Sequence, residues 1–443
     1  MLTAVVALYF VFALVNLRWA TLILPLFFPT YLLAFKVAGI PFNLIEGFIG
    51  VTFAAWVLRG IWNMARQERR AFALKLRTVV KNWQFVVAIV LILLGAVIGT
   101  LITAKQTFMI DGTTIFEGQK VALGILKSWI VLPIMMTVLF RFLFSKKEDY
   151  RLLLDFYTAT AFVLSVWAIW QVISGSFSTP DQRASGPFNS ANYLALYITP
   201  ALLYVFARFK KLSFIKVILF LVIGAALFFT KSYAAMIALF ISTFFYFGID
   251  SNWWKAWRQK KMAKAFWGVV LSIIFGGIIL GLALYKADPV KWNKFFEFTE
   301  RSSSSVRVEI YTIAVNLIKE HPLEGIGLGQ FPLFYQLQGP RILGHDPFEW
   351  NMLHPHNIFL AFWLNLGIFG LVGLFWILIL VYKKFIHEVK GGFMDEDKSL
   401  NFPRLKVIVF AMLLVVIIHG FFDTPFFKND LSLLFWLLIS VII

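Results

Sequence analysis

The chain has 443 residues, of which 60% are hydrophobic and only 14% are charged, and its formal net charge is +18. Soluble domains carry about 25% charged residues, so the composition excludes a water-soluble globular protein and predicts a chain whose main solvent is lipid. Cysteine is absent, which excludes disulfides, thiolate catalysis and cysteine-based metal sites.

Apolar runs of membrane-spanning length follow one another along the chain. A helix needs about 20 apolar residues, sometimes about 17, to cross a bilayer. The first two runs are short and separated only by Arg18, so they form either two spans or one broken unit, and the last run is also short. The sequence therefore predicts an all-α polytopic membrane protein with 12 or 13 transmembrane helices. The runs are 2–17, 19–38, 42–62, 82–104, 120–144, 152–175, 190–208, 213–229, 232–249, 266–285, 355–382, 405–420 and 430–443.

The basic residues gather in short loops between these runs. Nucleic-acid binding is one interpretation of the positive charge, but this placement favours orientation signals, because cytoplasmic loops are enriched in Lys and Arg. Five basic loops alternate consistently along the chain and are predicted to be cytoplasmic: 65–81, 146–151, 208–211, 255–264 and 383–390. The opposite side then receives 105–119, 176–189, the turn near 230, 286–354 and 421–429.

The segment 286–354 is long and has a composition of its own, with acidic residues that nearly balance the basic ones. Apolar residues recur at helical spacing over 304–320, and Pro322 follows, which predicts an amphipathic helix that ends there. We expect a large, structured extracytoplasmic loop packed on the bundle. The chain then divides into an N-terminal helix bundle (1–285), the loop (286–354) and C-terminal helices (355–443).

His356 is the strongest candidate for chemistry. It lies in Leu-His-Pro-His-Asn, where the long loop meets a predicted helix, and Pro355 suits the first turn. An imidazole there can stay neutral and accept a proton near neutral pH. The alternative is a helix-end histidine that bonds backbone or a lipid headgroup. Gly367, Gly370 and Gly373 follow on one side of the predicted helix, where small residues let a neighbouring helix approach.

Several cations run against the positive-inside trend on the same face. Arg183 precedes the run at 190–208, Lys231 lies at the turn between two spans, and Arg301 and Arg307 flank the serines that open the amphipathic segment. Arginine matches phosphate oxygens bidentately and stays charged. Anion binding is therefore one explanation, and pairing with loop acids such as Glu309 is the other.

The other motifs give little support to a specific activity. The glycines at 325, 327 and 329 lack the Gly-Lys-Ser/Thr ending of a phosphate loop, and no His/Asp/Glu cluster has metal-ligand spacing. A triad of Ser302, His356 and Asp423 has no nucleophile-elbow sequence behind it. Acids inside the spans are scarce, which disfavours a proton-relay pump.

The motif residues resemble those of the O-antigen ligase and O-antigen polymerase superfamily of bacterial membrane glycosyltransferases. The resemblance covers most of the chain and is most specific at His356-Asn357, followed after nine residues by Gly367-Ile-Phe-Gly370. One departure is Tyr233, which stands where that family commonly has an arginine. Lys231 is the candidate to supply the charge instead. The supporting motif residues are Arg183, Gly186, Phe188, Asn189, Asn192, Arg307, His321–Phe331, His419, Asp423 and Pro425.

The resemblance implies transfer of a glycan from undecaprenyl pyrophosphate to an acceptor hydroxyl at the outer face of the bacterial cytoplasmic membrane. His356 and Arg307 would be catalytic, Arg183, Arg301 and Lys231 would bind substrate, and Gly367 and Gly370 would pack the helix. No metal, cofactor or nucleotide sugar is implied. The acceptor stays open among lipid A core, a glycan and a protein hydroxyl. A glycan polymerase or a protein O-oligosaccharyltransferase is the alternative within the superfamily, and a bicarbonate-type transporter the alternative from another class.

Overall fold

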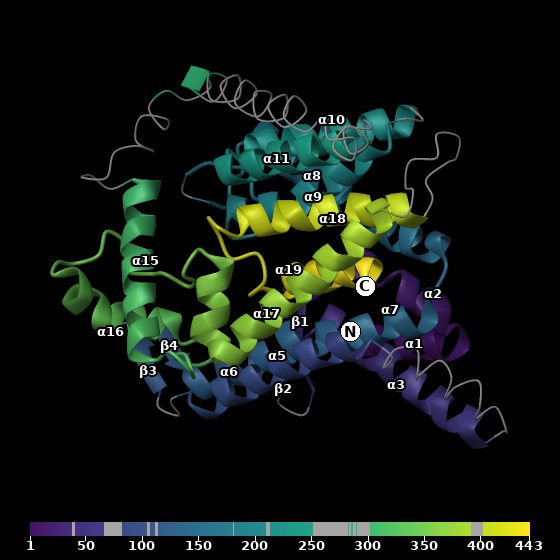
Figure 1. Cartoon of the computed structure of the whole chain (residues 1–443), viewed down its shortest axis with the longest axis horizontal. Coiled ribbons are helices and arrows are strands. Elements are labelled where there is room, and N and C mark those ends of the chain that lie inside the picture. The colour runs from purple at the N-terminus through teal and green to yellow at the C-terminus, as the bar shows by residue number, and fades with distance from the viewer. Residues whose placement is uncertain are drawn as a thin grey trace.

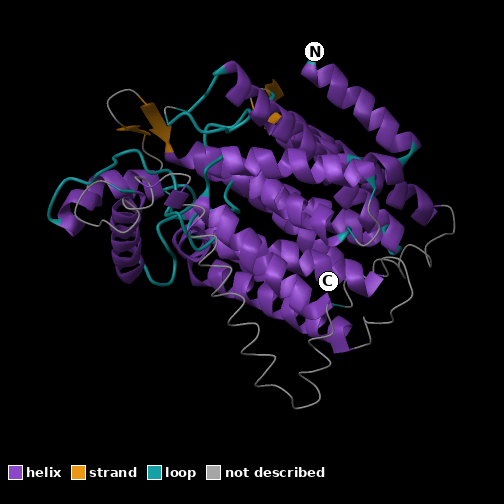
Figure 2. Cartoon of the chain, turned by 90° about the horizontal axis from the view of Figure 1, so that it is seen from above, coloured by secondary structure: helices purple, strands orange, loops and turns teal. Residues whose placement is uncertain are grey.

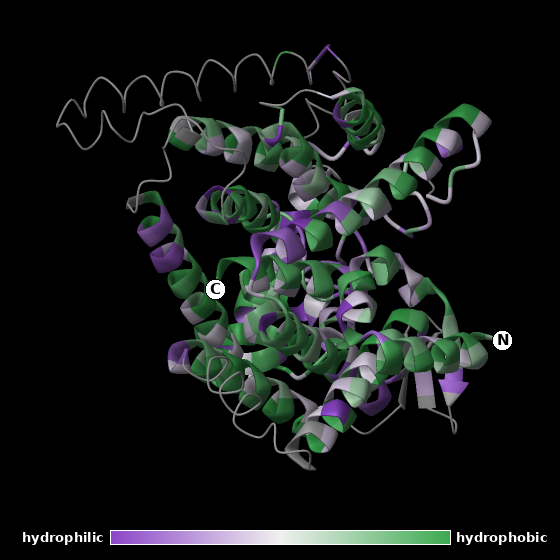
Figure 3. Cartoon of the chain, turned by 90° about the vertical axis from the view of Figure 1, so that its right-hand side faces the viewer, coloured by the Kyte–Doolittle hydropathy of each residue, from purple (hydrophilic) through white to green (hydrophobic). Residues whose placement is uncertain are grey.

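The computed structural model is nearly all helical (Figure 1). It describes residues 1–37, 40–65, 82–103, 107–110, 114–179, 181–209, 213–250, 302–390 and 402–443, with isolated positions between 282 and 289. Hydrophobic residues dominate the helices of the bundle (Figure 3). These features confirm the prediction of an all-α polytopic membrane protein.

Six of the described helical segments are long and apolar enough to cross a membrane. They are α3 (Leu44–Ala65), α5 (Trp83–Leu101), the continuous segment α6–η2–α7 (Gly118–Ile125, Leu126–Val131, Leu132–Leu143), α8 (Lys147–Ser174), α17 (Ile358–Lys390) and α18 (Phe402–His419). Shorter apolar helices are α1 (Leu2–Val15), α9 (Ala191–Ala207), α10 (Phe214–Phe229), α11 (Tyr233–Asp250) and α19 (Asn429–Ile442). The predicted run at 266–285 lies outside the described residues, apart from two single positions.

The predicted run at 19–38 is not one spanning helix. After α1 the chain forms a short helix α2 (Leu17–Leu22) and a 3-10 helix η1 (Leu24–Leu32). A hairpin of β1 (Ala34–Val37) and β2 (Ile40–Asn43) follows, with Ala34 opposite Asn43. Proline lacks an N–H group and its ring clashes with the preceding turn, so Pro25 and Pro29 interrupt a run that hydropathy alone joins. A second hairpin, β3 (Thr107–Ile110) and β4 (Thr114–Glu117), occupies the predicted loop 105–119.

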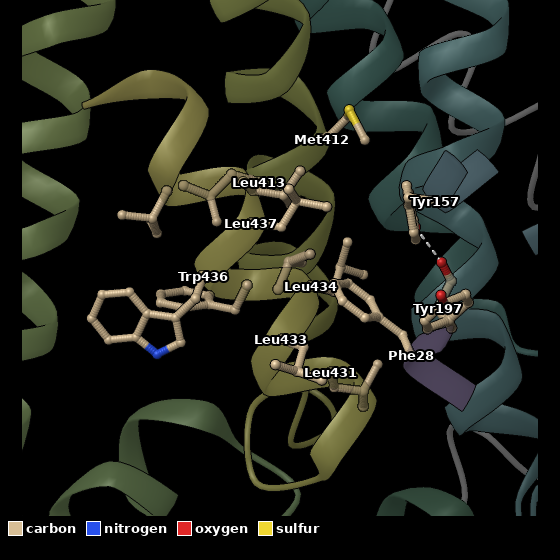
Figure 4. Close-up of a cluster of buried hydrophobic side chains, with 14 of the residues drawn as sticks. Phe28, Tyr157, Tyr197, Met412, Leu413, Leu431, Leu433, Leu434, Trp436 and Leu437 are labelled. Atoms are coloured by element: carbon tan, nitrogen blue, oxygen red, sulfur yellow. Dashed lines mark hydrogen bonds between the residues drawn. The ribbon is translucent and has the colours of Figure 1, made fainter. Parts of the chain in front are cut away.

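The short helix α19 is at the centre of the bundle. Nearly all of its residues are buried, among them Leu434 and Trp436, and it packs against α18, α7, η1 and α9. Figure 4 shows its leucines facing Phe28 of η1 on one side, with the Tyr157 hydroxyl donating to the Tyr197 carbonyl nearby. Protein therefore surrounds α19, which needs no lipid-facing surface.

The described part of the long loop, 302–354, is folded and lies at one end of the bundle (Figures 1 and 2). The predicted amphipathic helix is confirmed as α15 (Ser303–Glu320), which begins with a capping box of Ser302 and Ser305. It ends before Pro322, as Pro requires. A second helix, α16 (Phe331–Leu343), was not expected from the sequence and packs on α15. Buried residues of both helices join Leu364 of α17 in one apolar cluster, which fixes the loop to the bundle.

Candidate functional site

His356 lies just before α17, in a conformation that the sequence does not reveal. The helix begins at Ile358, and the Asn357 side chain caps it by accepting from Phe359 N at 2.9 Å and Leu360 N at 3.1 Å. Pro355 therefore lies outside the first helical turn, in contrast to the prediction. His356 has a φ of +46°, a left-handed backbone that is uncommon for residues other than glycine and often occurs at functional sites.

Asp423, in the loop between α18 and α19, is the nearest charged partner of His356. Its Oδ1 atom lies 3.3 Å from His356 Nδ1, within ion-pair distance but without hydrogen-bond alignment. The His356 side chain is 29% exposed, whereas that of Asp423 is 2% exposed. Burial alone would raise the pKa of Asp423, but His356, His419 and the Thr424 N–H outweigh it and hold the pKa well below the usual range. The site thus holds a buried carboxylate behind a half-exposed imidazole.

Arg307 approaches the same loop from α15. Its Nε donates to the Phe422 carbonyl at 3.1 Å and its Nη1 donates to the Ser303 carbonyl at 2.8 Å. It forms no ion pair with any described acid; Glu309 is buried and accepts from Phe348 N instead. The ion-pair alternative for Arg307 therefore has no support in the described residues.

Tyr311, one turn further along α15, connects that helix to both sides of the site. Its hydroxyl lies 3.0 Å from the His356 carbonyl and 2.8 Å from the Phe421 carbonyl. The Asn357 amide also reaches the Phe421 carbonyl, at 3.4 Å. These bonds set the distance between α15, the start of α17 and the Asp423 loop.

Arg183 lies in the loop before α9 and is largely occupied by neighbours. Its Nε donates to the Thr230 carbonyl at 2.6 Å, its Nη2 to Asn192 Oδ1 at 2.8 Å, and its Nη1 lies 3.3 Å from Asp181 Oδ2. Burial is the largest influence on Arg183 and lowers its pKa; Asp181 and Asp423 act in the opposite direction and Arg307 in the same one. Arg183 is therefore close enough to Asp423 and to Arg307 for their charges to act on it, and it also connects its own loop to the turn that carries Lys231.

The turn between α10 and α11 carries Lys231. Lys231 follows Thr230 in that turn, with a φ of +48°, and its N–H donates to the Phe228 carbonyl at 3.0 Å. The turn is adjacent to Arg183 through Thr230. Arg301 lies outside the described residues.

The glycines after His356 do not form one uniform packing face. Gly367 has φ +62° and ψ −165°, which breaks α17 into two helical parts. A side chain there would meet the backbone of Glu324, whereas one at Gly373 would meet Ile92 and the Ala88 carbonyl of α5. Gly367 therefore admits the loop after α15, and close contact with α5 occurs at Gly373 and around Gly370, against Gly95.

Sequence reasoning did not place Asp423 and Tyr311 among the candidate site residues. Asp423 had a signal, because it is part of the family-like segment near the end of the chain. Tyr311 had none, since its position on the amphipathic helix is that of an ordinary partly buried residue. Ser302 uses its side chain in the capping box of α15, which agrees with the rejection of a serine triad.

Comparison with known proteins confirms the resemblance. Residues 217–375 match the model of the O-antigen ligase family, a segment that contains Lys231, Arg307, His356, Gly367 and Gly370. Two curated relatives carry the name "Putative polysaccharide ligase". The Rickettsia felis protein is 27% identical over 126 residues, 28% of this chain and 30% of the relative. The Rickettsia conorii protein is 27% identical over 154 residues, 34% of each chain. The chain thus spans about a third of the length of these relatives.

Proposed function

We propose that this protein is a membrane glycosyltransferase that moves a glycan from an undecaprenyl-pyrophosphate carrier to an acceptor hydroxyl. The observation that carries the proposal is the meeting of His356, Asp423 and Arg307 at one end of the helix bundle, from three elements far apart in the sequence. The family match over residues 217–375 supports a glycan ligase.

His356 is proposed as the general base. A carboxylate at Nδ1 favours the tautomer that carries its proton there and leaves a lone pair on Nε2. Nε2 takes the proton of the acceptor hydroxyl as its oxygen attacks the anomeric carbon of the donor glycan. The new glycosidic C–O bond forms as the bond from that carbon to the pyrophosphate oxygen breaks. Asp423 then stabilises the imidazolium.

Arg307 is proposed to stabilise the leaving undecaprenyl pyrophosphate. Pyrophosphate departs with its charge and needs a cation more than a proton. Arg307 carries N–H groups beyond the two that bond carbonyls, and it has no described acidic partner. Arg183 belongs to the same proposed anion site, since a guanidinium has more N–H groups than its three bonds use. Lys231 and Arg301 complete the proposed set.

The site is proposed to face outward from the cytoplasmic (inner) membrane. The basic loops predict that the opposite end of the bundle is cytoplasmic, and the donor would be presented from the outer leaflet. We propose that the chain divides into a helix bundle (1–285), the long loop (286–354) and C-terminal helices (355–443), and that the α15 helix of the loop forms one side of the site. No metal has a role in this mechanism, because the imidazole and the guanidinium groups supply the base and the charge.

Reconstitution tests the proposed reaction. The purified chain in vesicles should transfer glycan from an undecaprenyl-pyrophosphate donor to one of three acceptors offered separately: lipid A core, a second lipid-linked glycan, or a protein. The acceptor that gains glycan distinguishes ligase, polymerase and protein glycosylation. Deletion in the native host should lead to accumulation of lipid-linked glycan. Absence of both transfer and accumulation would reject the proposal.

A further inference from the structure

Lys428 lies at the junction of the Asp423 loop and α19, where aromatic rings surround its ammonium group. Its Nζ is 3.7 Å from the ring centre of Tyr193, 4.4 Å from that of Phe188 and 5.5 Å from that of Tyr31. These rings come from α9, the loop before it and η1. The Tyr193 ring is in turn 6.5 Å from that of His354, two residues before His356.

The ammonium group has no acceptor among the described residues. Its Nζ is buried and forms no hydrogen bond, and no described carboxylate lies within ion-pair distance. An ammonium carries three N–H donors, and a buried charge without hydrogen bonds is costly. The ring faces offset part of that cost, but they leave directional donor positions open.

Two other lysines that lie over rings show what a structural lysine looks like in this protein. Lys127 is 4.2 Å from the Phe42 ring centre and also 2.8 Å from Glu46 Oε2. Lys406 is 4.8 Å from the Phe402 ring centre and also 2.9 Å from Glu388 Oε1. Each therefore has both a ring and a carboxylate. Lys428 has the rings only, and no described carboxylate contacts its ammonium group.

The charges around Lys428 place it within the candidate site. Burial is the main influence and lowers the pKa of Lys428 to about 8, against the attraction of Asp430 and Asp423. The group therefore stays mostly protonated at neutral pH. Lys428 also acts on His354, whose pKa burial lowers to about 4. Lys428 is therefore close enough to Asp423 and His354 for their charges to act on one another, and a ligand that contacts His356 and Asp423 would lie near its ammonium.

We infer that Lys428 is a binding residue for a phosphoryl oxyanion, whose oxygens would fill the open donor positions of its ammonium. The identity of that anion as the pyrophosphate of a prenyl-linked donor rests on the proposed function. The presence of an anion site at Lys428 rests on the rings, the burial and the missing acceptor alone. The family match ends at residue 375 and does not include this lysine.

Binding to the full-length chain in phosphatidylcholine nanodiscs tests the inference. The probes are undecaprenyl pyrophosphate, inorganic pyrophosphate and undecaprenol, which lacks the anion. Lys428→Met should weaken binding of undecaprenyl pyrophosphate about 10- to 150-fold, the range for loss of a charged hydrogen bond, and Lys428→Arg should lose less. Lys406→Met is the matched control, because it removes a lysine over a ring that already has a carboxylate, and it should bind like wild type.

A second measurement needs no variant. Undecaprenyl pyrophosphate should shift the NMR signal of the isotope-labelled Lys428 ammonium in the wild-type chain and should leave the Lys406 signal in place. An equal shift with undecaprenol or with phosphatidylglycerol would overturn the assignment to a pyrophosphate. Unchanged affinity in folded Lys428→Met would overturn the anion site itself.

The two proposals fail in different ways. If the wild-type chain binds undecaprenyl pyrophosphate through Lys428 but transfers no glycan, the anion site stands and the glycosyltransferase proposal falls. If transfer is normal and Lys428→Met binds and reacts like wild type, only the Lys428 site is rejected.

Discussion

At the scale of single residues, the candidate site joins groups that the sequence holds far apart. His356 and Arg307 can be picked out from the sequence, because each is a polar group of definite chemistry at an unusual place. Asp423 is marked in the sequence only by the family-like segment that contains it, and its role beside His356 emerges when α18 and α19 bring it 3.3 Å from His356 Nδ1. The left-handed backbone of His356 is likewise a product of tertiary packing. The Tyr311 hydroxyl donates to the His356 carbonyl, and the N–H of Ile358, two residues further on, donates to the Gly420 carbonyl.

The first residue-scale prediction concerns the proposed base. Removal of a general base typically costs about 100- to 10,000-fold in rate, so His356→Ala should insert, bind donor and transfer almost no glycan. His354→Ala should be milder, because the His354 side chain precedes Pro355 and has no described acidic partner. The measurement is transfer from purified lipid-linked donor. A His356→Ala rate above about a tenth of wild type is less loss than a base should show and would leave His356 a structural residue.

The second residue-scale prediction concerns the proposed anion site at Arg307 and Arg183. Arg307→Ala should weaken donor binding about 10- to 150-fold, the cost of a lost charge-assisted contact. Arg307→Lys should rescue only in part, because a point charge lacks the planar fork. Arg183→Ala should weaken binding too and also lower thermal stability, because it leaves the Thr230 carbonyl and Asn192 without their donor. Wild-type donor affinity in both folded alanine variants would rule the site out.

The third concerns pH and His354. Burial lowers its folded-state pKa to about 4, whereas an unfolded histidine titrates near 6.5. Between these values the unfolded chain binds the proton and the folded chain does not, so stability falls as the pH drops from about 6.5 towards 4. His354→Gln should flatten the fall in unfolding temperature over that window. An identical pH profile in wild type and His354→Gln would show that His354 does not titrate in this way.

At the scale of elements, hydropathy predicted most helices and failed where prolines and glycines determine the backbone conformation. The amphipathic pattern of 304–320 corresponds to α15 almost residue for residue, because one face packs on the apolar cluster. The run at 19–38 failed because Pro25 and Pro29 break it. Helix α16 escaped prediction because Pro332, Gly339 and Pro340 obscure its pattern, while packing against α15 stabilises it.

The contact of α5 with α17 provides an element-scale prediction. A side chain at Gly95 would overlap the Leu366 carbonyl and come within 2.9 Å of Gly370 N. Gly95→Ala should therefore separate the helices and lower thermal stability, despite the better helix propensity of alanine. Gly224 of α10 has no heavy atom within 4 Å of an added side chain, so Gly224→Ala is the matched control and should be neutral or stabilising by up to about 1 kcal/mol. Equal unfolding temperatures for the two variants would contradict close packing at Gly95.

At the scale of the whole molecule, the charge pattern predicts which end of the bundle faces outward. The structure shows which residues lie at each end. Ser303 lies at the candidate site, because its carbonyl accepts from Arg307. Ser213 begins α10, whose far end carries the Phe229 carbonyl that accepts from Ala184 beside Arg183. At about 1.5 Å per residue, α10 places Ser213 about 24 Å from that end. The two serines therefore mark opposite ends of the bundle.

The absence of cysteine in the chain makes this orientation directly testable. Both serines are exposed and both lie at the start of a helix, so Ser303→Cys and Ser213→Cys are a matched pair. Positive-inside bias assigns the 208–211 loop, next to Ser213, to the cytoplasm and therefore the opposite end, with Ser303, to the outside. In intact cells a membrane-impermeant maleimide should accordingly label Ser303→Cys. The maleimide should label Ser213→Cys only after the membrane is permeabilised. The reverse pattern would place His356, Arg307 and Lys428 on the cytoplasmic face, where an outer-leaflet donor could not reach them, and the proposed reaction would have to be abandoned together with the topology.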